Sequence, residues 1–148
     1  MYSWIDDVVE GLKDTYGSTD IYELFDYLEI KIVKLEPSNI LLKGNESLYY
    51  RDFLEKEIVF IRNDLHERYK KFILAHELGH ALLHTNTYEA AFNKDLLNTG
   101  KLEKEANYFA FRMMNVQFDE IELEGMCLEQ IASYIEIPYR PFSQIVNL

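Results

Sequence analysis

The sequence predicts an α+β domain, with helices at both ends and a small, mainly antiparallel sheet that precedes a central apolar helix. Two patterns lead to this fold class: apolar residues recur at helical spacing near both ends of the chain, and short strand-like runs lie between residues 30 and 62. The third observation is the length of 148 residues, which is enough for one domain with a sizeable core. We therefore expect residues 1–148 to form one domain, with the helical segment from about residue 123 to residue 148 as part of the same unit.

The first 28 residues predict two amphipathic helices. The first runs from Ser3 to about Tyr16 and ends at Gly17, because glycine readily adopts the left-handed conformation that closes a helix. The side chains of residues 18–20 are all able to cap the helix that follows. Its buried face would consist of Ile21, Leu24, Phe25 and Leu28.

Residues 30–62 predict the sheet. The alternation of apolar and basic residues in Ile30–Leu35 is typical of a strand, and Ile40–Leu42 and Ser47–Phe53 predict two more strands around a turn. Glu57–Arg62 is an apolar run between charged ends, and it predicts the strand that directly precedes the central helix.

Composition excludes several classes of protein. Hydrophobic residues make up 48% of the chain and aromatic residues 14%, which excludes a disordered protein. With 15 basic and 26 acidic residues the net charge is −11, and this charge opposes direct binding to nucleic acid. The sequence contains neither a membrane-spanning run nor a signal peptide at its start, and Cys127 is a single cysteine without an internal disulfide partner. We expect a cytoplasmic protein with no membrane partner.

The central helix carries a His-Glu-x-x-His motif at residues 76–80. Four residues make just over one helical turn, so His76 and His80 lie on one face, roughly 6 Å apart along the axis. At this spacing two imidazoles can bind one zinc ion, and Glu77 can take a proton from water beside it without binding the metal. The alternative is a helix that carries two histidines by accident. Two of only four histidines at ligand spacing, beside a carboxylate, favour the metal site.

The third ligand does not come from the same helix. An extended form of the motif needs a glycine and a histidine at positions that hold Leu83 and Asn86 here. His84 lies eight residues from His76, roughly 12 Å along the axis, so we interpret it either as a support outside the coordination sphere or as a surface residue.

A second helix, predicted over Leu102–Met114, supplies a carboxylate instead. Glu103 shares the edge of its apolar face with two alanines, whose small side chains allow close approach to another helix. Glu105 is expected to point toward Tyr108 and Arg112, nearer to solvent. We predict Glu103 as the third ligand. Asn107, one turn later, could hold Glu103 or a histidine by a hydrogen bond from outside the coordination sphere.

The motif Ala-His-Glu-Leu-Gly-His-Ala-Leu-Leu-His, followed by Glu-x-x-Ala-Asn-x-Phe-Ala, resembles the ImmA/IrrE family of metallopeptidases from about Val33 to Pro138. The resemblance implies that His76, His80 and Glu103 bind zinc and that Glu77 is the catalytic glutamate. The length and the C-terminal segment look more like the ImmA branch, whose members belong to phages and integrative elements and cleave the element's own repressor. The substrate implied is therefore a repressor protein. One departure is Asn115, where many relatives have proline.

Two other functions compete with site-specific proteolysis. A regulatory protein could bind the repressor without cleaving it and use zinc only as a structural ion, or a zinc hydrolase could act on a small molecule. The sequence names neither the cognate repressor nor the oligomeric state.

Substrate binding is expected at a strand, because zinc peptidases of this motif class bind the substrate backbone as an added strand. The candidate residues are Ile58, Val59, Phe60 and Ile61, although so apolar a run is equally typical of a central strand. Gly79 would let the Glu103 helix or a strand approach closely. The sequence does not choose an oxyanion-stabilising residue among Tyr49, Tyr50, Tyr88 and Tyr134.

Overall fold

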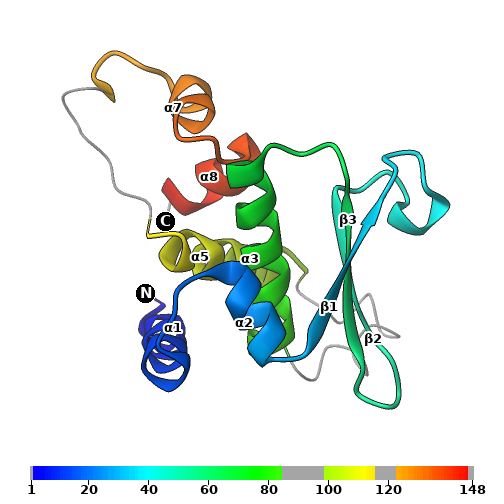
Figure 1. Cartoon of the computed structure of the whole chain (residues 1–148). Helices are drawn as coiled ribbons and strands as arrows, with labels where there is room; N and C mark the ends of the chain where they lie inside the picture. The colour runs from blue at the N-terminus through cyan, green and yellow to red at the C-terminus, as the bar shows by residue number, and fades with distance from the viewer. Residues whose placement is uncertain (1, 85–98, 116–122, 147–148) are drawn as a thin grey trace.

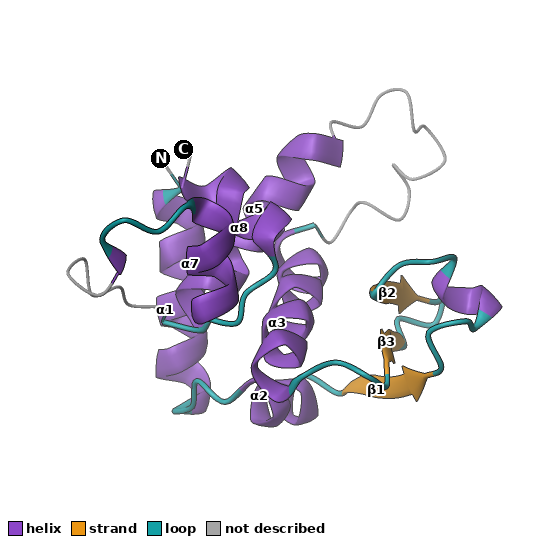
Figure 2. Ribbon diagram, turned by 90° about the horizontal axis from the view of Figure 1, so that it is seen from above, coloured by secondary structure: helices purple, strands orange, loops and turns teal. Residues whose placement is uncertain are grey.

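The computed structural model describes residues 2–84, 99–115 and 123–146 (Figure 1). The helices gather on one side of the molecule and the sheet lies on the other, with α3 between them (Figure 2). The elements in chain order are α1 (Ser3–Tyr16), α2 (Ile21–Tyr27), β1 (Ile30–Leu35), the 3-10 helix η1 (Ile40–Leu42), β2 (Ser47–Arg51), β3 (Glu57–Arg62), α3 (Glu67–Leu83), α5 (Thr99–Met113), α7 (Leu128–Tyr134) and α8 (Tyr139–Val146). The predicted α+β class is confirmed.

The N-terminal helices begin and end where local sequence signals place them. Gly17 closes α1 in the left-handed conformation, with a φ of 65°, and its N–H donates to the carbonyl of Lys13. Of the three residues able to cap α2, Asp20 does so: its side chain accepts hydrogen bonds from the backbone N–H groups of Tyr22 and Glu23. These caps satisfy backbone groups that a helix end leaves without partners.

The sheet is mixed and not mainly antiparallel as predicted, and it has the strand order β1-β3-β2. β3 pairs in parallel with β1, from Ile30 opposite Glu57 onward, and in antiparallel with β2. Val59 and Ile61 of β3 are fully buried and join the core that also contains Phe72 and Leu74 of α3. One face of the sheet thus packs toward the central helix.

The central position of β3 overturns its expected role as the template for a substrate strand. Both edges of β3 are hydrogen-bonded to neighbouring strands, so Ile58, Val59, Phe60 and Ile61 offer no unpaired backbone groups to an incoming peptide. The physical reason is the apolar character of the run, which favours a position inside the sheet, between two other strands. Of the two alternatives that the sequence left open, the structure shows the central strand.

The strand predicted at Ile40–Leu42 is also wrong, because these residues form η1. The side chain of Asn39 accepts a hydrogen bond of 2.9 Å from the N–H of Leu41 and starts a turn, and the N–H of Lys43 then donates to the carbonyl of Ile40. A local bond from an asparagine side chain therefore prevails over the apolar pattern. Ile40 is 86% exposed, so no burial favours a strand at this position.

Close contact between α3 and α5 brings the two halves of the predicted metal site together. A Cβ atom on Gly79 would lie 3.1 Å from Cδ1 of Phe109 and 3.2 Å from Cα of Ala106, closer than side chains ordinarily pack. Glycine is thus required for this approach, as the sequence predicted for Gly79 and the Glu103 helix. α5 ends at Met113, and Asn115 follows with a φ of 50°.

The C-terminal helices pack beside the same pair. Pro138 directly precedes α8, where its fixed φ suits the start of a helix. α8 is tied to α5 by a hydrogen bond of 2.8 Å from Nδ2 of Asn107 to Oε1 of Gln144. Within the described ranges, none of the helices has the length and apolar character needed to cross a membrane.

Candidate metal centre and active site

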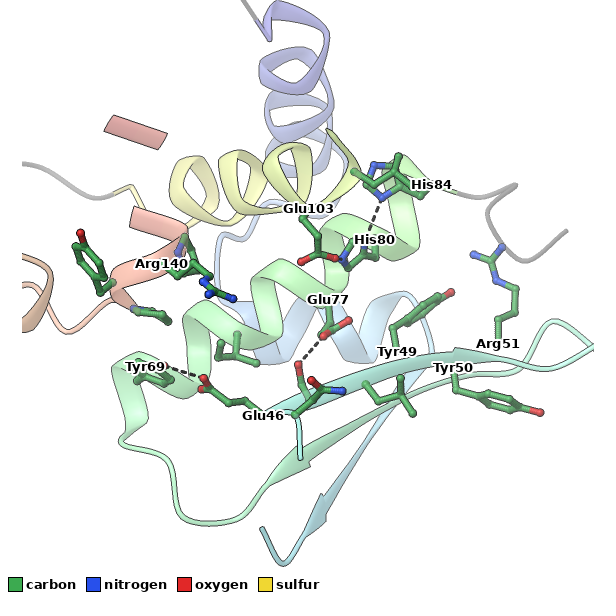
Figure 3. Close-up of a pocket in the computed structure, with 18 residues that line it drawn as sticks. Glu46, Tyr49, Tyr50, Arg51, Tyr69, Glu77, His80, His84, Glu103 and Arg140 are labelled. Atoms are coloured by element: carbon green, nitrogen blue, oxygen red, sulfur yellow. Dashed lines mark hydrogen bonds and ion pairs between the residues drawn. The ribbon is translucent and has the colours of Figure 1, made fainter. Parts of the chain in front are cut away.

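Three side chains from two helices converge at one point. His76 and His80 come from consecutive turns of α3, and Glu103 comes from the first turns of α5. The Nε2 atoms of the two histidines are 3.1 Å apart, and the Glu103 carboxylate lies 3.3 Å from Nε2 of His76 and 2.9 Å from Nε2 of His80. Figure 3 shows Glu103 reaching from α5 toward His80. The structure therefore brings together the three predicted ligands.

This donor set fits a tetrahedral zinc ion with one open position. Bonds of about 2.0–2.1 Å at tetrahedral angles place neighbouring ligand atoms roughly 3.3–3.4 Å apart, close to the separations found here. The Nδ1 atoms of both histidines are engaged elsewhere, at 2.6 Å from Asn107 and 3.0 Å from His84. The two Nε2 atoms are consequently the ones that can share one ion. Two histidines and a glutamate also form the ligand set of known catalytic zinc sites.

The electrostatics of the group keep Glu103 in the form that binds metals. Burial raises the pKa of Glu103, but hydrogen bonds from His76 and His80 outweigh it and hold that pKa well below its usual range. Burial lowers the pKa of His76, but the hydrogen bond to Glu103 and the charge of Glu77 outweigh it and raise that pKa. Glu103 is therefore an ionised carboxylate at neutral pH even before a metal binds.

Asn107 orients the first histidine. Its side-chain oxygen accepts a hydrogen bond of 2.6 Å from Nδ1 of His76, and its amide nitrogen donates to Gln144 of α8. Asn107 is only 3% exposed. Of the two partners predicted for Asn107, the structure shows the histidine and not Glu103.

A second support reaches His80, and it corrects the interpretation of Glu105. Nδ1 of His84 lies 3.0 Å from Nδ1 of His80, and Nε2 of His84 lies 3.1 Å from Oε2 of Glu105. His84 is 7% exposed and Glu105 is 4% exposed, so neither is a surface residue. On a helical wheel Glu105 falls about 20° from Arg112 and about 40° from Phe109, at the border of the apolar face. Helical periodicity alone cannot show whether a residue at this border is buried or exposed. In the structure, the contact with the buried His84 places Glu105 on the buried side.

Glu77 is buried, and a residue of the sheet holds it by a hydrogen bond. It is 6% exposed, and its Oε1 accepts a hydrogen bond of 2.5 Å from the hydroxyl of Ser47 at the start of β2. A dashed line in Figure 3 marks this bond. The sequence offered no signal for Ser47, because the contact joins elements that are 30 residues apart.

A cleft of about 790 Å³ runs past these groups, between α3 and β2. Tyr69 bonds to Glu46 just before β2, Glu77 bonds to Ser47, and the carbonyl of Ala81 accepts from Arg51 at the end of β2. The order of these contacts shows that β2 runs in the same direction as α3. Residues 47–51 of β2 all line the cleft, and among the described strands β2 pairs with β3 alone. The other edge of β2 therefore faces the cleft.

The cleft also tests the tyrosines considered for the oxyanion. Tyr49 and Tyr50 line it, Tyr134 is not among its lining residues, and Tyr88 lies outside the described residues. The Tyr49 hydroxyl donates to Glu57 at 2.9 Å, and burial raises its pKa. Arg140, at the start of α8, lines the cleft as well, and the sequence did not indicate it.

Comparisons with known proteins agree with this site. The family model of the IrrE N-terminal-like domain, Peptidase_M78, matches residues 25–147. The chain is 31% identical over 138 residues to "Metallopeptidase ImmA" of Bacillus subtilis (strain 168), covering 88% of this chain and 76% of the relative. It is also 31% identical over 115 residues to "Uncharacterized immunity region protein 2" of Bacillus phage phi105, covering 76% of this chain and 69% of the relative. The chain therefore belongs to the ImmA/IrrE family of metallopeptidases.

Proposed function

We propose that this protein is a zinc-dependent endopeptidase that cleaves one segment of a repressor protein encoded by a phage or another mobile element. The observation that carries the proposal is the convergence of His76, His80 and Glu103 beside a buried Glu77, at a cleft walled by an edge of β2 that pairs with no other described strand. A zinc ion held by the three ligands would supply Lewis-acid activation of water and of the scissile carbonyl.

Glu77 is the general base in this proposal. Its carboxylate takes a proton from the attacking water and passes it to the leaving amine. The hydrogen bond from Ser47 orients the carboxylate, and burial excludes competing water from it. A base held in one rotamer loses less entropy in the transition state.

β2 takes over the substrate-binding role that the sequence had assigned to β3. An extended peptide can add to its cleft-facing edge through backbone hydrogen bonds, and such an edge lies beside both Glu77 and the three ligands. Backbone pairing of this kind needs a segment that is extended and exposed in the substrate. This requirement favours cleavage at one accessible segment over degradation of folded proteins in general.

Two observations favour a repressor as the substrate. One relative is named as an immunity region protein of a phage, and another as Metallopeptidase ImmA. The net charge of −11 opposes direct action on DNA, so an effect on gene expression would pass through another protein.

The test is to express the parent protein or Glu77→Gln together with each repressor from the same element and to follow repressor length by blotting. We expect a single cleavage with the parent and none with Glu77→Gln, which can still accept the Ser47 hydrogen bond. Equal zinc content of the two proteins, by elemental analysis, would show that the variant lost the base and not the metal. Promoter release by a repressor that stays full length would overturn proteolysis in favour of regulation by binding.

A further inference from the structure

A chain of three side chains leads from the partly buried ligand His80 to the buried residues His84 and Glu105. It runs from Nδ1 of His80 to Nδ1 of His84 over 3.0 Å, and from Nε2 of His84 to Oε2 of Glu105 over 3.1 Å. The side chains of His84 and Glu105 are 3% and 5% exposed. A buried carboxylate is costly unless its partners compensate. The partners of Glu105 here are His84 and the ammonium of Lys101, whose Nζ lies 4.0 Å from Oε1.

The carboxylate at the end of the chain determines which nitrogens carry protons. A carboxylate oxygen accepts hydrogen bonds, so Nε2 of His84 donates to Oε2 of Glu105. In the neutral imidazole, Nδ1 of His84 is then an acceptor, and Nδ1 of His80 must donate to it. With Nδ1 of His80 committed to this bond, Nε2 is the nitrogen that can present a lone pair to a metal, on the side of Glu103 and His76. The whole chain thus holds His80 in the tautomer that binds a metal.

The other ligand is held differently. Nδ1 of His76 donates to the Asn107 oxygen, and the Asn107 amide donates to Gln144. This chain contains only neutral amides and ends on α8. Both histidines present Nε2 to the same point, but one is supported by a carboxylate and the other by amides.

We infer that His84 and Glu105 are positioning residues for the metal, which fix the tautomer and orientation of His80 and strengthen it as a ligand through the charge of Glu105. The inference rests on the metal site of the proposed function, but not on its peptidase activity. Partners outside the coordination sphere that hydrogen-bond a histidine ligand typically contribute 10- to 100-fold in metal affinity.

The test measures zinc affinity by competition with a chromophoric chelator, without any substrate. Glu105→Gln keeps the size of the side chain, but its amide can donate to His84 and reverse the chain. We expect affinity to fall about 10- to 100-fold in Glu105→Gln and in His84→Gln. Glu105→Asp, which keeps the charge, should recover part of the loss. The absorption spectrum of the cobalt-substituted protein should change in the same variants, because it reports ligand geometry.

Matched controls separate positioning from folding and from net charge. Glu129→Gln removes one exposed carboxylate on α7, and His66→Gln removes the exposed histidine before α3. Both should bind zinc as the parent does. The double variant His84→Gln/Glu105→Gln should lose no more than the larger single loss, since both residues act through one chain. Thermal unfolding of the metal-free proteins identifies any variant that fails to fold.

A measurement on the unaltered protein keeps the inference testable if the variants unfold. Nitrogen NMR of the metal-free parent should show a proton on Nδ1 of His80, whether or not Nε2 also carries one toward Glu103, and should show His84 protonated at Nε2. The opposite tautomers would overturn the inference, and so would folded Glu105→Gln and His84→Gln proteins that bind zinc like the parent. A parent that binds zinc but cleaves no repressor overturns only the peptidase, whereas a parent that binds no zinc overturns both.

Discussion

The two walls of the cleft differ in what they contribute to the site. The helix pair α3 and α5 carries the three predicted ligands. The side chains that hold the two histidines are buried and joined to them by hydrogen bonds. β2 contributes the hydroxyl that holds Glu77 and a strand edge without a partner strand among those described. A metal needs fixed, converging donors, whereas a peptide needs an accessible backbone edge. Metal retention and turnover should therefore respond to separate mutations.

Loss of a ligand from the helix pair should have the largest effect. Glu103→Ala removes the carboxylate that joins α5 to the two histidines, so we expect it to bind less than one tenth of the zinc of the parent and to lose repressor cleavage. Elemental analysis after dialysis against a weak chelator measures the first effect, and the blotting assay the second. A Glu103→Ala protein with full zinc content would show that another residue is the third ligand.

A change in the sheet wall should reduce turnover without loss of metal. Ser47→Ala removes the hydrogen bond that orients Glu77, and a hydrogen bond to a charged group contributes about 1.5–3 kcal/mol. We expect the cleavage rate at saturating substrate to fall about tenfold to a hundredfold, with unchanged zinc content. Loss of zinc from Ser47→Ala would contradict the division between the two walls.

The contact between the helices can be changed without touching a ligand. In Gly79→Ala the added Cβ would lie 3.1–3.3 Å from Phe109 and Ala106, and overpacking of this kind typically costs about 1–3 kcal/mol. We expect a lower unfolding temperature and weaker zinc binding, because α5 carries Glu103. Phe109→Leu in the same protein should restore part of the loss by removing the ring. Unchanged stability of Gly79→Ala would mean that the helices can separate at little cost.

The smallest effect is expected far from both walls. Asn39→Ala removes the side-chain bond that starts η1, and the loss of such a cap costs about 0.5–2 kcal/mol. Denaturant unfolding should show this decrease, while zinc content and cleavage stay as in the parent. A change in either would indicate that η1 takes part in the site.

Much of the local structure could be predicted, because its signals lie within a few residues of one another. The bounds of α1 at Ser3 and Tyr16, the left-handed Gly17 and the spacing of His76 and His80 follow from helix geometry and capping alone. One wrong prediction was also local. The apolar run at Ile40–Leu42 was assigned to a strand, although the cap at Asn39 turns it into a 3-10 helix.

Helical periodicity and motif spacing suffice to predict the fold class and to bring the candidate ligands His76, His80 and Glu103 into one hypothesis. Three further features could be seen only once the chain was folded: β3 is central, Ser47 holds Glu77, and Glu105 is buried behind His84. Each of these depends on which elements pack together. Long-range contacts set the order of the strands, the bond between Ser47 and Glu77 across 30 residues, and the side of α5 on which Glu105 is buried. The periodicity of residues within one element carries no information about such contacts.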